Sequence, residues 1–159
     1  MVRSIGPGLR QLWRRCAPLP GGNWLFSRLL GLRAPYSGTL GARVETLEPG
    51  CCVVRLRDRR RVRNHLNSVH AMALANLGEL ATGLALAGSL PEGTRGILTG
   101  FSMDYVRKAR GRLRAECHCE IPASGREQEY LVSGEIRDQA GELVATARAR
   151  WLVGPEPAR

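Results

Sequence analysis

The chain has 159 residues, of which 43% are hydrophobic and 5% aromatic, and its formal net charge at pH 7 is +10. This length suffices for one domain with a well-packed core and excludes two domains of ordinary size. The basic charge favours anionic partners, but so few aromatic side chains argue against stacking on bases, so we expect no nucleic-acid partner.

The first 34 residues are basic, and no acidic residue precedes Glu45. Arginines are spread along this segment: Arg3, Arg10, Arg14, Arg15, Arg28 and Arg33. Acid-free, arginine-rich segments are typical of organelle targeting peptides, which is one interpretation. The other is an amphipathic helix packed on the domain, because Trp24, Phe26 and Leu30 supply apolar side chains at helical spacing. We favour the packed helix and assign residues 1–34 to a basic amphipathic helical segment.

Two strands are expected next. Residues 36–48 are compatible with a strand, and Pro49-Gly50 is a strong turn signal. Residues 51–56 alternate, with Cys52, Val54 and Leu56 on one face, which predicts a half-buried strand. Residues 58–63 then form a basic connector that contains four arginines.

The longest apolar pattern of helical type covers residues 68–87 and ends at Gly88 and a loop at residues 91–93. Its only charged residue is Glu79. A carboxylate on an apolar helix is costly to desolvate unless it is paired or has a chemical task. Polar residues gather where this helix should begin, namely Asn64, Asn67, Ser68 and His70. A polar helix start with one acid in the middle of the helix predicts a functional site.

The rest of the chain has the pattern of strands and turns. Strands are expected at residues 97–107, 113–121, 130–137 and 143–153, with a turn at 138–141 and a disordered tail at 155–159. The predicted order is a helix, two strands, one long helix and four strands. This order gives an α+β domain over residues 35–154, in which an antiparallel sheet wraps the central helix.

The five cysteines are odd in number and lack paired CxxC spacing: Cys16, Cys51, Cys52, Cys117 and Cys119. We therefore expect no disulfide framework and no metal site. In a strand, the two sulfurs of residues 117 and 119 lie on one face and His118 on the other, which favours packing over metal binding. Unpaired cysteines are typical of a reducing compartment, so we expect a cytoplasmic protein. No transmembrane segment is expected, because the longest apolar run carries Glu79.

Two motifs point to a family. Asn64, His70-Ala71-Met72 and Glu79 follow one another at spacings of six and nine residues, and residues 104–111 read DYVRKARG. Together with the order of elements, this resembles the hotdog fold, and within it the PaaI-like acyl-CoA thioesterases. Their signature is Asn, then His-Gly-Gly, then Asp or Glu at these spacings, followed by a strand end with an aromatic residue, Arg, Pro, Ala and Gly. Residues 24–83 are also similar to a bacterial branch of this superfamily.

The chain departs from the family pattern in two places. His-Gly-Gly is His-Ala-Met here, so Ala71 keeps the backbone N–H of the first glycine while bulky Met72 replaces the second. Lys108 replaces the usual proline and adds a positive charge. The resemblance to the fold survives both changes, whereas Met72 narrows or redirects the expected acyl pocket.

The spacing also bears on assembly. At about 100° per residue, His70 and Glu79 point to nearly opposite sides of one helix. In hotdog dimers the acid of one subunit faces the helix start of its partner. The resemblance therefore implies a homodimer or a dimer of dimers with the site at the dimer interface.

The resemblance implies a role for each site residue. The Ala71 N–H would stabilise the oxyanion, Glu79 would act as general base or as nucleophile, and Asn64 and His70 would orient water or polarise the thioester carbonyl. The residues expected to contact acyl-CoA are Ser68, Met72, Thr99, Arg107, Lys108 and Arg110. The three basic residues among them suit the phosphates of coenzyme A, which enters as substrate, so that no resident cofactor is expected.

Simpler interpretations stay open for each residue. Glu79 can pair with an arginine of the sheet, His70 can cap the helix, and Asn64 can be a turn residue. The basic strand end can be a solvated surface. At the level of function, the alternative to a thioesterase is a non-catalytic hotdog module that binds acyl groups or proteins, with charge-driven binding to membranes or nucleic acid ranked below it.

Overall fold

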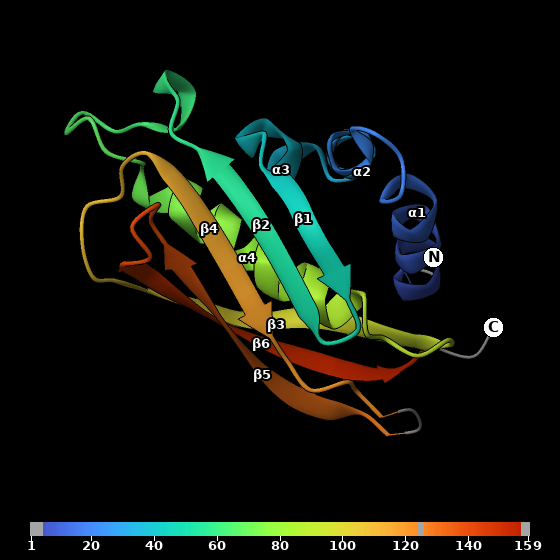
Figure 1. Ribbon diagram of the computed structural model, residues 1–159. Helices are drawn as coiled ribbons and strands as arrows, with labels where there is room; N and C mark the ends of the chain where they lie inside the picture. Colours follow the sequence, from blue (N-terminus) through green and yellow to red (C-terminus); the bar gives the residue numbers. More distant parts are fainter. Residues whose placement is uncertain (1–4, 124–125, 157–159) are drawn as a thin grey trace.

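The computed structural model describes residues 5–123 and 126–156 and has an α+β architecture (Figure 1). Six antiparallel strands form one curved sheet in the order β1-β2-β4-β5-β6-β3. The strands are β1 (Arg43–Glu48), β2 (Cys51–Arg57), β3 (Thr94–Tyr105), β4 (Arg112–His118), β5 (Gln128–Arg137) and β6 (Leu143–Pro155). The helices are α1 (Gly6–Cys16), α2 (Gly22–Arg33), α3 (Pro35–Leu40) and α4 (Ala71–Ala87), with a short 3-10 turn η1 (Arg60–Val62). The predicted antiparallel sheet around one central helix is confirmed.

The core lies between α4 and the concave face of the sheet. Leu77 and Ala81 of α4 are fully buried, as are Leu56 and Ile136 of the sheet. Gly78 permits the close approach of helix and sheet, because a Cβ there would stand 2.6 Å from the Ala147 Cβ. Burial of these apolar side chains, at about 25 cal/mol per Å² of apolar surface, is the main force that holds α4 in place.

Helices α1 and α2 pack on this core beside β1 and the end of α4 (Figure 1). Phe26 is fully buried and makes an edge-to-face contact with Trp13 at 5.0 Å between ring centroids. Arg10 donates to the carbonyls of Gly88 and Leu90, which satisfies acceptors at the C-terminal end of α4. These contacts pack α1 and α2 on the rest of the domain. Among the described residues, no helix has both the length and the apolar character needed to cross a membrane.

The expectation of a strand over residues 36–48 is wrong in its first half, where α3 forms. Pro35 presets the helical φ angle at the first position of α3. Gly38 packs directly on Gly31 of α2, since a Cβ on Gly38 would stand 2.7 Å from the Gly31 carbonyl oxygen. Gly41, at φ 62°, ends the helix in the left-handed conformation. The strand begins only at Arg43.

The central helix begins at Ala71 rather than at residue 68. Before it, Ser68 lies in a bend and Val69 forms an isolated β-bridge with Arg63, and the Val69 N–H donates to the Ala109 carbonyl (2.8 Å). At the other end of the chain, β6 includes Pro155, the first residue of the expected disordered tail. Pro155 pairs with Thr94 of β3, and the Glu156 N–H donates to the Gly93 carbonyl. Residues 157–159 of that tail lie outside the described residues.

Candidate active site

Glu79 lines an apolar cavity of about 220 Å³ beside the second half of α4. The cavity lies where four parts of the chain meet: α4 itself, the start of β3, the end of β6 and the N-terminal helices. Besides Glu79, the residues that line it include Ile5, Leu30, Ala34, Ser37, Leu80, Gly83, Leu84, Arg95, Gly96 and Trp151. The acid predicted from the sequence therefore borders an apolar space.

The Glu79 carboxylate has no hydrogen bond or ion pair to any other described residue. Burial raises the pKa of this carboxyl above its ordinary value of 4.5, because desolvation disfavours the charged form. The pairing with a sheet arginine that the sequence left open is not seen, although Arg95 also lines the cavity. A half-buried acid without a partner is a base whose proton affinity is set by its surroundings, which is typical of functional sites.

The indole of Trp151 lies beside this carboxylate. Glu79 Oε1 is 3.3 Å, and Trp151 Cζ2 is 3.4 Å, from the point where a Cβ on Gly83 would stand. Trp151 Nε1 is buried and has no hydrogen-bond partner among the described residues. An unsatisfied buried N–H costs free energy, so Trp151 is held at a cost that its packing against the helix offsets.

The start of α4 is organised by His70. His70 is the N-cap, and its Nδ1 accepts a hydrogen bond from the Met72 N–H (3.0 Å). The capping interpretation of His70 is therefore correct, and a neutral ring with this bond carries its proton on Nε2. No acceptor for the Ala71 N–H is found in the part of the chain that the structure describes. This N–H lies at the positive end of the helix dipole and is available to a ligand.

Asn64 organises the loop that leads to this helix start. Its Oδ1 accepts hydrogen bonds from the Leu66 N–H, the Ser68 N–H and the Ser68 hydroxyl. Asn67, at φ 53°, completes the turn. Asn64 is thus a turn residue, as its simpler interpretation held, and only its amide Nδ2 is left to donate. Ser68, expected to contact substrate, is buried against Asn64.

The loop after β3 lies against the same helix start. Tyr105 Oη donates to the Ala71 carbonyl (3.1 Å), and the Val69 N–H donates to the carbonyl of Ala109. Lys108 and Arg110 are exposed nearby. The structure therefore brings residues 64–72 and 105–110 together.

The remaining residues predicted to contact acyl-CoA lie outside the Glu79 cavity. Arg107 forms an ion pair with Glu142 (2.9 Å), and Met72 is 59% exposed on the first turn of α4. Thr99 donates to the Arg150 carbonyl from the middle of β3, away from the helix start. None of these three side chains lines the Glu79 cavity.

Within one chain, Glu79 and the helix start at Ala71 lie far apart. Eight residues separate Ala71 from Glu79, which corresponds to about 12 Å along the axis of α4. The Glu79 cavity contains none of the other predicted site residues. The chain thus holds the acid in its apolar cavity and the helix start with its free N–H at two separate places.

Sequence reasoning missed most of the cavity. Trp151 reads as an ordinary strand residue, and Leu30 and Ser37 belong to segments far from Glu79 in the sequence. The one usable signal was Gly83, a glycine four residues after the acid on the same helix face. In the described residues no group of three or more His, Cys, Asp or Glu side chains is arranged to hold a metal.

Comparisons with known proteins agree with this architecture. A family described as a domain of unknown function (DUF4442) matches residues 22–153. A crystal structure from a structural-genomics programme is 29% identical to the chain, with a TM-score of 0.81, and the match covers 94% of this chain and 99% of that one. A protein from Pseudomonas aeruginosa, described as a probable thioesterase, is 25% identical with a TM-score of 0.75, covering 87% and 97% of the two chains.

More distant structures share the fold. A thioesterase family protein from Silicibacter pomeroyi has 22% identity and a TM-score of 0.70, with 82% of this chain and 96% of that chain covered. A comparison with curated proteins finds no match. The sheet order, the central helix and these likenesses together show that the chain belongs to the DUF4442 family and has the hotdog fold of the thioesterase-like superfamily.

Proposed function

We propose that the protein hydrolyses acyl-CoA thioesters at a site shared by two copies of the chain. The observation that carries this proposal is the unpartnered Glu79 carboxylate, held in an apolar cavity that lacks the helix-start donor needed beside it. The similar Pseudomonas aeruginosa protein, described as a probable thioesterase, supports the same reaction class.

Pairing through strand β3 offers a way to bring Glu79 of one copy next to the helix start at Ala71 of another. It is an edge strand, and among the described strands it pairs with β6 alone. If two copies pair β3 with β3 in antiparallel fashion about a twofold axis at the strand centre, Tyr105 of one copy lies near Thr94 of the other. Tyr105 is bonded to Ala71, while Arg95 and Gly96 line the Glu79 cavity. Such pairing would bring the helix start of one copy to the acid of the other.

The chemistry follows from these groups. Water attacks the thioester carbonyl carbon while the Glu79 carboxylate accepts its proton, which forms a tetrahedral oxyanion. The Ala71 N–H and the dipole of α4 stabilise that oxyanion, which then collapses, expels the thiolate and leaves a carboxylic acid. The His70 Nε2–H and the Asn64 amide are further donors at the helix start. The apolar lining of the cavity would hold the acyl group.

A panel of acyl-CoA thioesters of different chain length, with aryl and alkyl members, tests this function by release of free thiol. We expect turnover with at least one member, at a rate that depends on enzyme concentration. Tight binding of acyl-CoA without thiol release from any member would contradict hydrolysis and would leave the non-catalytic acyl-binding module as the function.

Gly83→Ala probes the cavity without loss of stability. The added methyl lies 3.3 Å from Glu79 Oε1 and 3.4 Å from the Trp151 ring, so it narrows the space that the acyl group needs. Alanine also favours a helix over glycine by about 1 kcal/mol. We expect kcat/KM to fall by about 10- to 100-fold, while the urea midpoint stays equal or rises.

The matched control is Gly8→Ala in α1, where a Cβ would meet nothing within 4 Å. This variant makes the same chemical change in a helix at a position that does not line the cavity, so its activity should match that of the unmodified protein. Equal activity of both variants would show that the cavity beside Gly83 does not receive substrate.

A further inference from the structure

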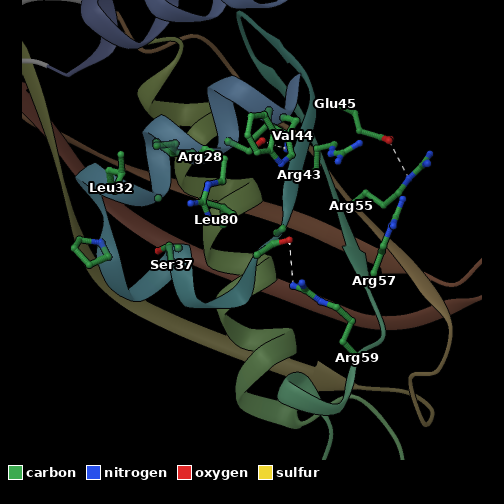
Figure 2. A pocket seen from close by; sticks show the side chains of 18 residues that line it. Arg28, Leu32, Ser37, Arg43, Val44, Glu45, Arg55, Arg57, Arg59 and Leu80 are labelled. Carbon is green, nitrogen blue, oxygen red and sulfur yellow. Dashed lines mark hydrogen bonds and ion pairs between the residues drawn. The ribbon is translucent and has the colours of Figure 1, made fainter. Parts of the chain in front are cut away.

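A second hollow, which we call the arginine groove, lies between α2 and α3 on one side and β1 and β2 on the other (Figure 2). Its volume is about 480 Å³. Five arginines line it, Arg28, Arg43, Arg55, Arg57 and Arg59, against the single acid Glu45. In Figure 2, Arg55, Arg57 and Arg59 lie along one side, with Arg28, Leu32 and Ser37 across from them.

Only part of this positive charge is neutralised. Arg55 forms an ion pair with Glu45 (2.9 Å). Arg28, Arg43 and Arg57 have no ion-pair or hydrogen-bond partner among the described residues. Arg43 and Arg55 are directly opposite each other in the β1–β2 register, an arrangement of like charges that destabilises a sheet. An anion between the strands would remove this repulsion.

One guanidinium is fixed in advance. Arg59 Nη2 donates to the carbonyl of Leu40 at 3.0 Å, and it lies 2.3 Å from where a Cβ on Gly41 would stand. Gly41 is therefore needed both for its left-handed backbone and for the space that Arg59 occupies. A guanidinium held in place loses less entropy when it binds an anion.

The groove is next to the Glu79 cavity. Leu30, Ser37 and Leu80 line both spaces, and Leu80 directly follows Glu79 on α4. A ligand with an apolar end and a phosphorylated end could thus use both at once. Guanidinium groups bind phosphate through paired N–H donors, which makes an arginine-lined hollow a suitable site for several phosphates.

We propose that the arginine groove binds the phosphate groups of the coenzyme A thioester whose acyl end enters the Glu79 cavity. This inference rests on the proposed hydrolase function. It moves the phosphates from the loop with Lys108 and Arg110, where the sequence motifs placed them, to the groove over β1 and β2. The groove lies over the edge of the sheet opposite β3, so pairing of two copies through β3 leaves it open.

The test combines the double variant Arg43→Gln/Arg57→Gln with two substrates. For acyl-CoA we expect KM to rise by about 10-fold or more, because each lost phosphate contact weakens binding. With the matching acyl-pantetheine, which lacks phosphates, the variant should show no such rise. Both side chains are exposed and unpaired, so the variant should melt at the same or a higher temperature than the unmodified protein.

Two control variants distinguish the loss of contacts in the groove from a general loss of positive charge and from the loss of contacts at the loop with Lys108 and Arg110. Arg112→Gln removes an exposed arginine beside Arg57 in the β2–β4 register but outside the groove, and should leave KM unchanged. A KM for acyl-CoA that rises in Lys108→Gln/Arg110→Gln and not in the groove variant would overturn the inference.

Calorimetric titration with coenzyme A itself distinguishes the two proposals. If no thioester is hydrolysed but the groove variant binds coenzyme A about 10-fold more weakly, the hydrolase function fails and the groove assignment stands. If hydrolysis occurs and neither KM nor coenzyme A binding changes in the groove variant, the hydrolase function stands and the groove assignment is overturned.

Discussion

Replacing Glu79 with glutamine is expected to lower kcat for acyl-CoA hydrolysis by about 10²- to 10⁴-fold, the range that a general base contributes. Glutamine keeps the size of the side chain but cannot accept the proton of the attacking water. Because the buried carboxyl has a raised pKa, the acid limb of the kcat/KM profile of the unmodified enzyme should lie above pH 4.5. Thiol release across a pH series measures both effects.

The same substitution makes a prediction for stability. The pKa of Glu79 is higher in the folded than in the unfolded protein, so the protonated acid favours folding. This contribution is complete below the unfolded pKa and is lost as the pH rises through the folded pKa. As the pH rises from the unfolded pKa through the folded pKa, the free energy of unfolding of the unmodified protein should therefore fall relative to that of the glutamine variant. Urea unfolding at several pH values would show this.

Glu92→Gln is the matched control, since Glu92 is exposed in the loop before β3. It should change neither the activity nor the pH dependence of stability. Full turnover by the Glu79 variant would contradict the assigned base. A free energy of unfolding of the variant that falls relative to that of the unmodified protein as the pH rises would contradict the raised pKa.

Ala71→Pro is expected to remove the oxyanion donor while keeping the helix. Proline is favoured at the first position of a helix and has no N–H. His70, at φ −64° and ψ 141°, already has the extended backbone that a residue before proline requires. Loss of one oxyanion donor costs about 10²- to 10³-fold in kcat. Ala71→Ser retains the N–H, so the difference between the two variants measures the contribution of that donor.

Mixing the two inactive variants tests whether the site is shared. In a dimer of one Glu79→Gln chain and one Ala71→Pro chain, a shared site pairs the intact acid of one with the intact N–H of the other. Co-refolded at equal amounts, the mixture should recover about a quarter of the unmodified rate, since half of the dimers are mixed and each has one intact site. If every site lies within one chain, all sites carry a lesion and the mixture stays inactive.

Sequence reasoning succeeded where a local period decides the structure. The alternation of Cys52, Val54 and Leu56 predicted β2, and the long apolar pattern predicted most of α4. Residues 35–40 carry no such period, and α3 forms there because Gly38 fits against Gly31 of α2. The helix begins three residues later than its apolar pattern predicts, because the Val69 N–H donates to the carbonyl of Ala109, a partner distant in the sequence.

Parts of the candidate site could likewise be predicted from local sequence patterns, and other parts could not. Glu79 and the polar helix start were visible in the sequence, because a single charge in an apolar helix and a cluster of polar residues before it are local patterns. The Trp151 indole, the N-terminal wall of the cavity and the facing pair Arg43 and Arg55 were not, because each depends on segments that meet only after the chain has folded. Local sequence patterns thus predicted most of the helices and strands and singled out Glu79. Long-range packing and strand register determined which residues surround Glu79.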